Sequence, residues 1–488
     1  MKFDILVCTD NKNGIGRDGE IPWKIKEDIT FFKHKTTTTN LPCQINAIIM
    51  GRITAESIGY PLKDRINIVI SRTQEEEYDR DGYSYFRSLD DALKHLATVD
   101  NLDKIFVIGG QELYTTAVAH KYLQNIYITK LEHDYKCDRF FTLSGGTFNG
   151  KNGVKTQCRD TLNEITVDVK FMHLQKEPHE ELQYLELMER VIKTGEFKAT
   201  RNGNTWSLFG GQMTFDLRNG VFPLITTKRV PLRLIFEEKM FFLRGQTDVN
   251  ILKKKNVHIW DDNTTEEFIK KHDLKYQYGD KAGQYYEEGD LGPMYGWQFR
   301  NYGAKYCGKH YNYKPGEGFD QLAYVINLLK TDQSSRRIMM TSYNPVDAQN
   351  SVLYPCHGNI IQFNIGSHEN IKYLNCQMTQ RSADEMLGLP FNISSYSLLV
   401  YILCEIVNNA PDYKGDKITP GKLVISLGDM HVYEEHINQV KTQLERQPYE
   451  FPKLKFNKKI TSVDDIEWEN VVLENYKSHE PIKAQMVA

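Results

Sequence analysis

The chain has 488 residues, of which 40% are hydrophobic and 26% are charged, so its length and composition predict two or three ordinary folded domains. Its 61 basic and 64 acidic residues give a formal charge of -3, which argues against a general nucleic-acid binder but leaves room for a few arginines around one phosphate. The eight cysteines form no CxxC pair, so we expect neither a disulfide framework nor a metal site.

The first third of the chain alternates short runs rich in Ile and Val with helical segments. Helices are predicted over 24–35 and 88–97, and strands over 45–50, 66–71, 104–110, 125–130 and 165–171. This alternation predicts an α/β domain built around a mostly parallel sheet. The N-terminal residues contain no secretory apolar segment, and together with the scattered cysteines this indicates a cytoplasmic protein.

A charged segment that contains Pro178 interrupts this pattern at residues 175–180. After it, apolar residues recur at helical spacing, at Leu182, Leu185, Met188 and Ile192. We therefore predict a first domain over 1–176, a linker over 177–181 and a second domain over 182–488. In the second domain the apolar stretch 397–407 is too short to span a membrane and contains a glutamate, so it predicts a core helix.

One acidic residue, Asp28, lies in an apolar stripe of the first predicted helix, together with Ile25, Ile29 and Phe32. A carboxylate in that position is costly to bury unless it meets donors, although an Asp near a helix start also favours the helix dipole. Farther along, 50–59 and 107–114 place small residues at strand-to-helix turns, where phosphates bind. A GxGxxG fingerprint is absent from the sequence.

Taken together and in this order, the motifs IGRDGEIPW, MGRITAESIG, PLKDRINIVIS and VIGGQELY resemble dihydrofolate reductase over residues 3–172. The resemblance implies that Asp28 anchors the pterin ring and favours its protonation, that Arg65 pairs with the glutamate tail, and that NADPH is the cofactor. The implied dihydrofolate-binding residues are Val7, Cys8, Ile21, Asp28, Phe32, Arg65 and Thr129. The implied NADPH-binding residues are Cys8, Gly14, Ile15, Gly16, Arg17, Asp18, Gly19, Glu20, Gly51, Arg52, Ile53, Thr54, Ser71, Arg72, Gly109, Gly110, Gln111, Glu112, Leu113 and Tyr114. Ala55 stands where members of this family often carry a tryptophan, so a packing change is expected.

In the second domain, Cys356 lies in LYPCHGNIIQF, where its thiol could be a buried bystander, a metal ligand or a nucleophile. Arginines recur in polar segments, at Arg201, Arg336, Arg337 and Arg381. Cationic neighbours stabilise a thiolate, and several arginines at one place suit a phosphate dianion. Taken singly, each arginine is more commonly a solvated surface charge.

The long motifs FPLITTKRV, GDLGPMYGWQFR, SSRRIMMTSYNP, LYPCHGNIIQF, QRSADEMLGLPFN and SLGDMHVYEEH resemble thymidylate synthase over 182–488. With the first domain, the chain is similar to the bifunctional dihydrofolate reductase–thymidylate synthases of protists and plants, which implies an α+β second domain. The resemblance makes Cys356 the nucleophile toward dUMP, with Glu238, Tyr295 and Asn392 as further catalytic residues and 5,10-methylenetetrahydrofolate as cosubstrate. The implied dUMP-binding residues are Arg201, Arg336, Arg337, Arg381, Ser382, Asp384, Asn392, His431 and Tyr433. The implied folate-binding residues of this domain are Trp260, Asp384 and Ala488.

Arg336 and Arg337 come from the partner subunit in this family, so the resemblance also implies a homodimer. The amide of Asn392 offers one donor and one acceptor, which matches the N3–H and O4 of uracil, although an Asn here could equally be a helix cap. Two departures from the family stand out, a shortened RNGNT phosphate loop and Pro231 in place of a histidine. Two other hypotheses are a pyrimidine hydroxymethylase and a nucleic-acid-binding or scaffold protein with a decayed site, and the residues above speak against both.

Overall fold

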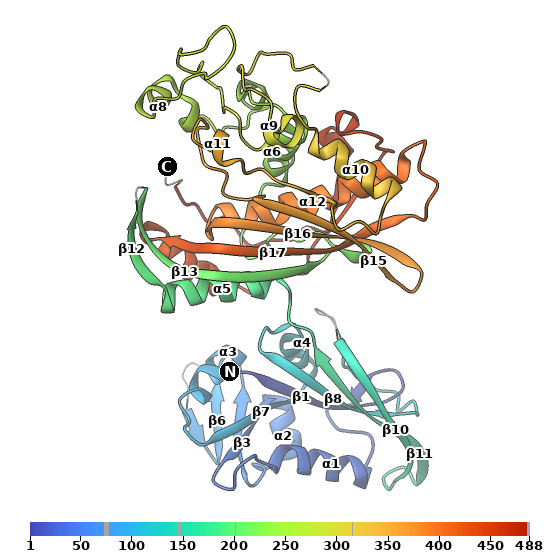
Figure 1. The fold of residues 1–488 in the computed structure, drawn as a ribbon. Coiled ribbons are helices and arrows are strands. Elements are labelled where there is room, and N and C mark those ends of the chain that lie inside the picture. Colours follow the sequence, from blue (N-terminus) through green and yellow to red (C-terminus); the bar gives the residue numbers. More distant parts are fainter. Residues whose placement is uncertain (73–77, 144–147, 201, 315, 486–488) are drawn as a thin grey trace. The chain divides into compact units, whose positions relative to one another are not determined.

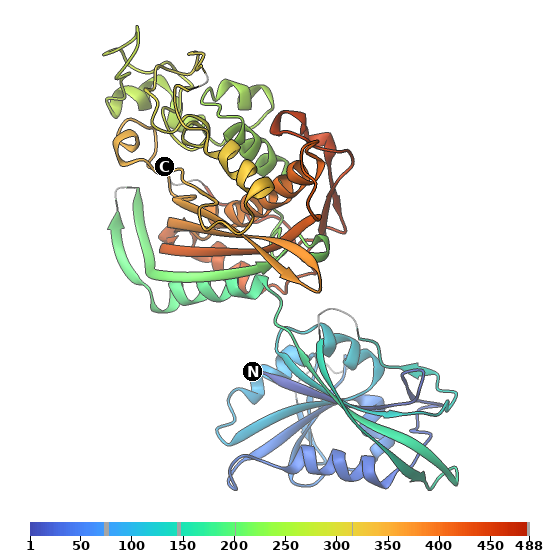
Figure 2. The same ribbon diagram turned by 45° about the vertical axis from the view of Figure 1, so that its right-hand side comes forward.

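The computed structural model describes residues 1–72, 78–143, 148–200, 202–314 and 316–485. The chain forms two compact units, Met1–His179 and Glu180–Ala488, which Figure 1 and Figure 2 show from two sides. The boundary between these units lies inside the predicted linker, residues 177–181.

The described residues of the first unit form a sheet of nine strands in the order β10-β11-β8-β1-β7-β3-β4-β6-β5. The strands are β1 Phe3–Thr9, β3 Ile45–Gly51, β4 Arg65–Ile70, β5 Tyr78–Arg80, β6 Tyr83–Phe86, β7 Leu102–Gly109, β8 Leu123–Leu131, β10 Phe148–Asp160 and β11 Ile165–Lys176. The five central pairings, from β8 through β1, β7, β3 and β4 to β6, are parallel. The mostly parallel sheet predicted from the sequence is therefore confirmed.

Helices pack on both faces of this sheet. They are α1 Lys26–Thr37, α2 Arg52–Ile58, α3 Leu89–Leu96 and α4 Gln111–Ala119. Alternate strand residues face opposite ways, so Ile5 joins a core cluster with the apolar residues of α3 and α4, whereas Leu6 joins a second cluster with Ala55 of α2. Ala55 is buried there together with Tyr83, at the position where a packing change was expected.

The predicted strand over 165–171 was too short. β11 continues to Lys176, because Gln175 pairs with both Asn125 of β8 and Asn149 of β10, and Lys176 pairs with Phe148. Two neighbouring strands thus hold Gln175 and Lys176, the first residues of the charged segment, in an extended conformation that their composition alone does not favour. A short ladder between β2 Gly14–Gly16 and β9 Arg139–Phe140 completes the unit.

The second unit has a six-stranded sheet in the order β12-β13-β17-β16-β15-β14 among its described residues. The strands are β12 Glu196–Thr200, β13 Gly203–Asp216, β14 Met339–Met340, β15 Ile360–His368, β16 Ile371–Asp384 and β17 Ile418–Tyr433, with a separate hairpin of β18 Lys453–Phe456 and β19 Val471–Glu474. Only β16 and β17 pair in parallel within this sheet, and the other pairings are antiparallel. The helices are α5 Glu181–Thr194, α6 Leu232–Leu243, α7 Asn250–Lys254, α8 Glu266–Lys271, α9 Gly296–Asn301, α10 Gln321–Thr331, α11 Pro345–Ala348, α12 Gly388–Asn409 and α13 Ile437–Leu444. This is the predicted α+β domain.

Helix α12 lies along one face of the second sheet in both views (Figures 1 and 2). It is long and apolar enough to cross a membrane, but 89% of its most apolar window is buried inside the unit. Residues 397–407 are therefore part of a core helix, as the sequence predicts. This helix packs against the sheet that contains β16 and β17.

Candidate active sites

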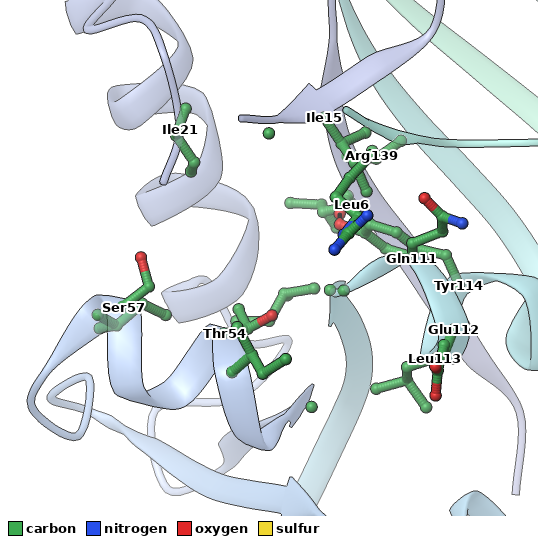
Figure 3. Close-up of a pocket in the computed structure, with 18 of the residues that line it drawn as sticks. Leu6, Ile15, Ile21, Thr54, Ser57, Gln111, Glu112, Leu113, Tyr114 and Arg139 are labelled. Atoms are coloured by element: carbon green, nitrogen blue, oxygen red, sulfur yellow. Dashed lines mark hydrogen bonds between the residues drawn. The ribbon is translucent and has the colours of Figure 1, made fainter. Parts of the chain in front are cut away.

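A cavity of about 1440 Å³ opens in the first unit between β1, α1, α2 and α4. Figure 3 shows Ile21 and Ser57 on one side of it, and Gln111, Tyr114 and Arg139 on the other. The carboxyl ends of parallel strands β1, β3 and β7 lead into this space, which is where open α/β sheets bind their ligands.

Asp28 is the acidic group of this cavity. Its carboxylate accepts hydrogen bonds from the Thr129 hydroxyl and the Cys8 thiol, which are neighbours because these two residues are partners in the β1–β8 ladder. Burial raises the pKa of Asp28 above its ordinary value, and both hydrogen bonds oppose that rise. Burial and the nearby carboxylate raise the pKa of the Cys8 thiol well above its usual range, so Cys8 stays protonated.

Part of the apolar stripe around Asp28 faces this cavity, whereas Ile25 packs into a core cluster with Tyr135. Ile29 and Phe32 both line the cavity, and Ile29 is 52% exposed, because this part of the stripe covers an open ligand space and not a filled core. Hence the carboxylate of Asp28 has an apolar surround that suits a flat aromatic ligand.

Two strand-to-helix turns meet at the other end of the cavity. A Cβ atom placed on either Gly109 or Gly110 would lie 3.3 Å from Thr54 Oγ1, so the β7–α4 turn is in close contact with α2. Gly109 has a φ of +140°, a conformation that strongly favours glycine. Arg52 and Arg72 line the cavity nearby and form exposed ion pairs with Glu56 and Glu112, each at 2.6 Å.

Most of the residues that the sequence assigns to the first site line this cavity. They are Val7, Cys8, Ile15, Gly16, Gly19, Glu20, Ile21, Asp28, Phe32, Gly51, Arg52, Ile53, Thr54, Ser71, Arg72, Gly109, Gly110, Gln111, Glu112, Leu113, Tyr114 and Thr129. The Tyr114 hydroxyl is already used within the fold, since it donates to the carbonyl of Leu6 at 2.7 Å.

Four assigned residues do not line the cavity. Arg65 donates to the Thr36 hydroxyl and the Lys63 carbonyl, whereas Arg17 and Asp18 belong to the loop beside it. Gly14 is buried, and a Cβ there would collide with Cys137 at 2.4 Å, so close packing explains this glycine.

Sequence reasoning missed other residues that line the cavity, namely Leu6, Trp23, Ile29, Phe31, Ser57, Ile58, Tyr60, Leu62, Ile70, Arg87, Ser88, Leu89, Ile108, Thr115, Thr116, Tyr127 and Arg139. Several of these lie one helical turn or one strand register from an assigned residue, and that spacing could have found them. Arg87 and Arg139 carry no such signal, because only the tertiary fold brings their segments to the cavity.

Cys356 lies in the segment between α11 and β15, near the guanidinium of Arg381 and the hydroxyl of Tyr295. The Cys356 N–H donates to Tyr295 Oη at 2.9 Å, and Nη2 of Arg381 lies 3.9 Å from Cys356 Sγ. Arg381 also donates to the carbonyls of Tyr354 and Pro355, which fixes its guanidinium beside the thiol. Burial raises the pKa of the Cys356 thiol, and the charge of Arg381 opposes that rise.

Glu238, on α6, is the acidic group of this second cluster. Trp260 Nε1 donates to Glu238 Oε1 at 2.9 Å, and the Trp260 ring lies 6.1 Å from that of Tyr295. Burial raises the pKa of Glu238, with the Trp260 hydrogen bond opposing, so this carboxyl can exchange a proton nearer neutral pH than an ordinary one. Tyr295 itself has a φ of 40° and stacks on Phe242 at 4.8 Å.

The pairing of β16 with β17 brings several assigned polar residues together. The parallel β16–β17 ladder pairs Asp384 with His431 and Ser382 with Asp429. His431 Nδ1 lies 3.1 Å from Asp429 Oδ1, and its ring meets that of Tyr433 edge to face at 5.3 Å. These residues therefore come together from two strands that are far apart in the sequence.

Asn392 is buried on α12, with 8% of its surface exposed. Within the residues that the structure describes, its side-chain amide has no hydrogen-bond partner. It does not cap a helix start, since it lies four residues inside α12 from Gly388. Its donor and acceptor thus stay available to a ligand.

Other assigned residues of the second site are not brought to Cys356. Arg336 and Arg337 are exposed, and in the described part of the chain neither guanidinium has a hydrogen-bond or ion-pair partner. Arg201 and Ala488 lie outside the described residues, so the structure does not place the shortened RNGNT loop at that arginine. Pro231 immediately precedes α6, at its N-cap.

The sequence reasoning also missed His357 and Tyr396, which lie directly behind the nucleophile. His357 Nδ1 is 2.9 Å from Tyr396 Oη, and the His357 ring stacks on Tyr295 at 4.6 Å. His357 follows Cys356 in the chain, which was a usable signal, but Tyr396 comes from the middle of an apolar helix. No group of three or more potential metal ligands occurs among the described residues.

Comparison with known proteins agrees with the two sites. The family model for dihydrofolate reductase matches residues 2–176, and that for thymidylate synthase matches residues 182–488. A bifunctional dihydrofolate reductase-thymidylate synthase of Zea mays is 35% identical, with the match covering 99% of this chain and 96% of that protein. The protein of the same name from Leishmania major is 36% identical, with 99% of this chain and 95% of the relative covered.

Bifunctional dihydrofolate reductase-thymidylate synthase 2 of Arabidopsis thaliana is also 35% identical, and the match covers 99% of this chain and 88% of the relative. Both family models, and relatives that match nearly the whole chain, thus agree with a reductase site at Asp28 and a synthase site at Cys356. The chain belongs to the bifunctional dihydrofolate reductase–thymidylate synthase family.

Proposed function

We infer that this chain is a bifunctional enzyme of thymidylate synthesis. The second unit transfers a one-carbon unit from 5,10-methylenetetrahydrofolate to dUMP and reduces it, which yields dTMP and dihydrofolate. The first unit reduces dihydrofolate to tetrahydrofolate with NADPH. The observation that carries this function is the presence in one chain of Cys356 against Arg381 and of Asp28 at the base of a large cavity.

In the reductase unit, we assign Asp28 to the pterin ring. A carboxylate flanked by Thr129 and Cys8 presents free oxygen lone pairs to an amino group and a ring N–H, and its negative charge favours a protonated ring. The β3–α2 and β7–α4 turns lie in contact, and Arg52 and Arg72 line the cavity beside them. This arrangement suits the phosphates of a dinucleotide. NADPH supplies the hydride when it is bound, and the apolar walls of the cavity exclude competing water.

In the synthase unit, we assign Cys356 to attack on C6 of the dUMP ring. Arg381 favours the thiolate and Tyr295 holds the backbone of the nucleophile. The new C–S bond places negative charge on the C5–C4–O4 system of the ring, and C5 then bonds to the methylene carbon as one of its C–N bonds to the folate opens. Loss of the C5 proton lets the second C–N bond break, which releases tetrahydrofolate. A hydride from tetrahydrofolate then reduces the methylene to methyl, leaving dihydrofolate, and the C–S bond breaks to free Cys356 and dTMP. Glu238 moves protons for these steps, and its raised pKa suits that task.

Asn392 is proposed to select uracil. A carboxylate at this position would instead accept a hydrogen bond from the amino group of cytosine, so the amide favours dUMP over dCMP. We assign His431 and Tyr433 to the sugar of dUMP and Asp384 to the folate. For Arg201, the phosphate role, and for Ala488, the folate role, rest on the resemblance alone.

We also propose that the protein acts as a homodimer through its synthase unit. The exposed guanidiniums of Arg336 and Arg337 have no partner in the described part of their own chain, which suits a phosphate held by another subunit. Phe209 is 84% exposed and Phe197 is 49% exposed, both on strands at one edge of the sheet, which suits a covered face. The eight free thiols support a cytoplasmic setting.

The test supplies purified protein with dUMP, methylenetetrahydrofolate and NADPH, and counts dTMP formed against NADPH oxidised. Equal amounts mean that both sites work in sequence. Cys356→Ser removes the nucleophile and should abolish dTMP formation while added dihydrofolate is still reduced. Loss of both activities would overturn the assignment of the two units, and a hydroxymethylated pyrimidine product would support the hydroxymethylase hypothesis instead.

A further inference from the structure

A buried lysine lies behind the synthase site. Lys239, on α6, is 1% exposed, and its ammonium has no hydrogen-bond partner among the described residues. Nζ lies 4.0 Å from the centroid of the Tyr396 ring, on α12. Burying a cation without hydrogen bonds is costly, and the negative face of an aromatic ring is a partial substitute for water.

A short chain of contacts joins this lysine to the nucleophile. Tyr396 Oη lies 2.9 Å from His357 Nδ1, and His357 stacks on Tyr295 with an interplanar angle of 22°. Tyr295 in turn accepts the hydrogen bond from the N–H of Cys356. Lys239 touches none of the expected substrates, so any effect on the reaction passes through these neighbours.

Titratable groups face Lys239 from four segments. Glu238 precedes it on α6, Cys376 comes from β16, Tyr396 from α12, and His357 from the segment before β15. Burial lowers the pKa of Lys239 to about 8, and Glu238 and Cys376 oppose that change, so the side chain is mostly charged at neutral pH.

The charge of Lys239 in turn changes the pKa values of Glu238 and His357. Lys239 opposes the rise that burial causes in the pKa of Glu238, and together with burial it lowers the pKa of His357 to about 3. A neutral imidazole beside Tyr396 and a carboxylate beside Trp260 are both compatible with the two observed hydrogen bonds, so the charge of Lys239 favours states that these contacts accommodate.

We propose that Lys239 is a positioning residue of the synthase site, whose buried charge favours the carboxylate form of Glu238 and the neutral form of His357. The inference rests on the proposed synthase function and deepens it, because it names the group that sets the protonation state of the proton-transfer residue. Removing the charge destabilises the Glu238 carboxylate, so the protonated form persists to higher pH.

The test compares full-length wild type with Lys239→Met, which keeps an unbranched side chain of similar length. Lys239 opposes the burial-driven rise in the pKa of Glu238, so its removal should move the acid limb of kcat/KM for dTMP formation to higher pH, by an amount on the order of one pH unit. Dihydrofolate reduction by the same molecules should keep its pH profile. Lys254→Met, at an exposed lysine of α7, is the matched control and should leave both profiles in place.

Lys239→Arg restores the charge, and it should return the acid limb toward its wild-type position. Superimposable normalised profiles for wild type and Lys239→Met would overturn the proposal. Lys239→Leu provides a second neutral variant if Lys239→Met unfolds in a thermal melt.

A second readout needs no turnover. Trp260 donates to Glu238, so its fluorescence should change as Glu238 ionises, and Glu238→Gln identifies that transition by removing it. In Lys239→Met the transition should lie at higher pH, and an unmoved transition would overturn the proposal. Failure of the wild type to form dTMP would refute the synthase function, whereas the fluorescence titration would still decide the role of Lys239.

Discussion

Glu181 at the start of α5 is fully buried, and it offers a sharp test of what holds the synthase unit together. Its two carboxylate oxygens accept four hydrogen bonds, from the backbone N–H and the hydroxyl of both Thr226 and Thr227, at 2.6–2.9 Å. These threonines lead into Lys228, whose ammonium bonds to the carbonyl of Met386, and then into α6 with Glu238. Glu181 thus anchors the segment that carries the proton-transfer residue.

Replacing Glu181 by Ala should cost about 3–5 kcal/mol of unfolding free energy. The two threonine hydroxyls can rotate toward other acceptors, but the two buried N–H groups cannot, and each unsatisfied group costs about 1–3 kcal/mol. Two such groups together give about 2–6 kcal/mol, which brackets the expected loss. Glu181→Gln keeps one acceptor oxygen and should lose about half as much.

Equilibrium unfolding in guanidinium chloride, followed by tryptophan fluorescence, measures this loss. Four of the five tryptophans lie in the second unit, at 206, 260, 297 and 468, so the signal reports mainly on that unit. Protein concentration must be equal in all samples, because a dimer couples stability to concentration. The midpoint should fall with an unchanged slope.

The matched control is Glu189→Ala on the same helix. Glu189 forms an exposed pair with Lys193, which is worth at most about 0.5 kcal/mol. A loss below about 1 kcal/mol for Glu181→Ala, or one equal to that of the control, would refute the anchoring argument.

Two further predictions concern the reacting groups. Asp28→Asn should lower kcat/KM for dihydrofolate reduction about a hundredfold or more at neutral pH, since the ring loses its carboxylate partner. The rate of dTMP formation by the same variant should stay at the wild-type value, and a parallel fall would contradict the separation of the sites. Arg381→Gln should slow alkylation of Cys356 by iodoacetamide several-fold to about tenfold, because loss of the cation raises the thiol pKa and leaves less thiolate. Quantifying the modified Cys356 peptide measures this, and an unchanged rate would show that Arg381 does not act on the thiol.

The sequence alone determined several elements of the first unit, two helical stretches of the second and, through the family motifs, the candidate site residues. Alternating runs of Ile and Val marked β3, β4, β7 and β8 to within two residues, because burial on both faces of a parallel sheet demands apolar residues throughout. The local context marked Asp28 and Cys356 as candidates, and the ordered family motifs around them gave each its expected role. These assignments needed only the order of residues in the chain.

Tertiary structure decided which distant residues face each other. Asp384 meets His431 only because β16 and β17 pair in parallel, and Arg381 reaches Cys356 only because β16 lies beside the loop before β15. The length of β11 followed from pairing with two neighbours, against the preference of its charged end.

The buried charge of Lys239 shows the same limit most clearly. In the sequence it is one lysine next to a glutamate on a helix, where consecutive side chains point in different directions and a solvated charge is the ordinary expectation. Only the packing of α6 against α12 and β16 removes it from water and places it over Tyr396. Local sequence sets which chemical groups are present, whereas burial and proximity, which fix their charge states, are properties of the folded chain.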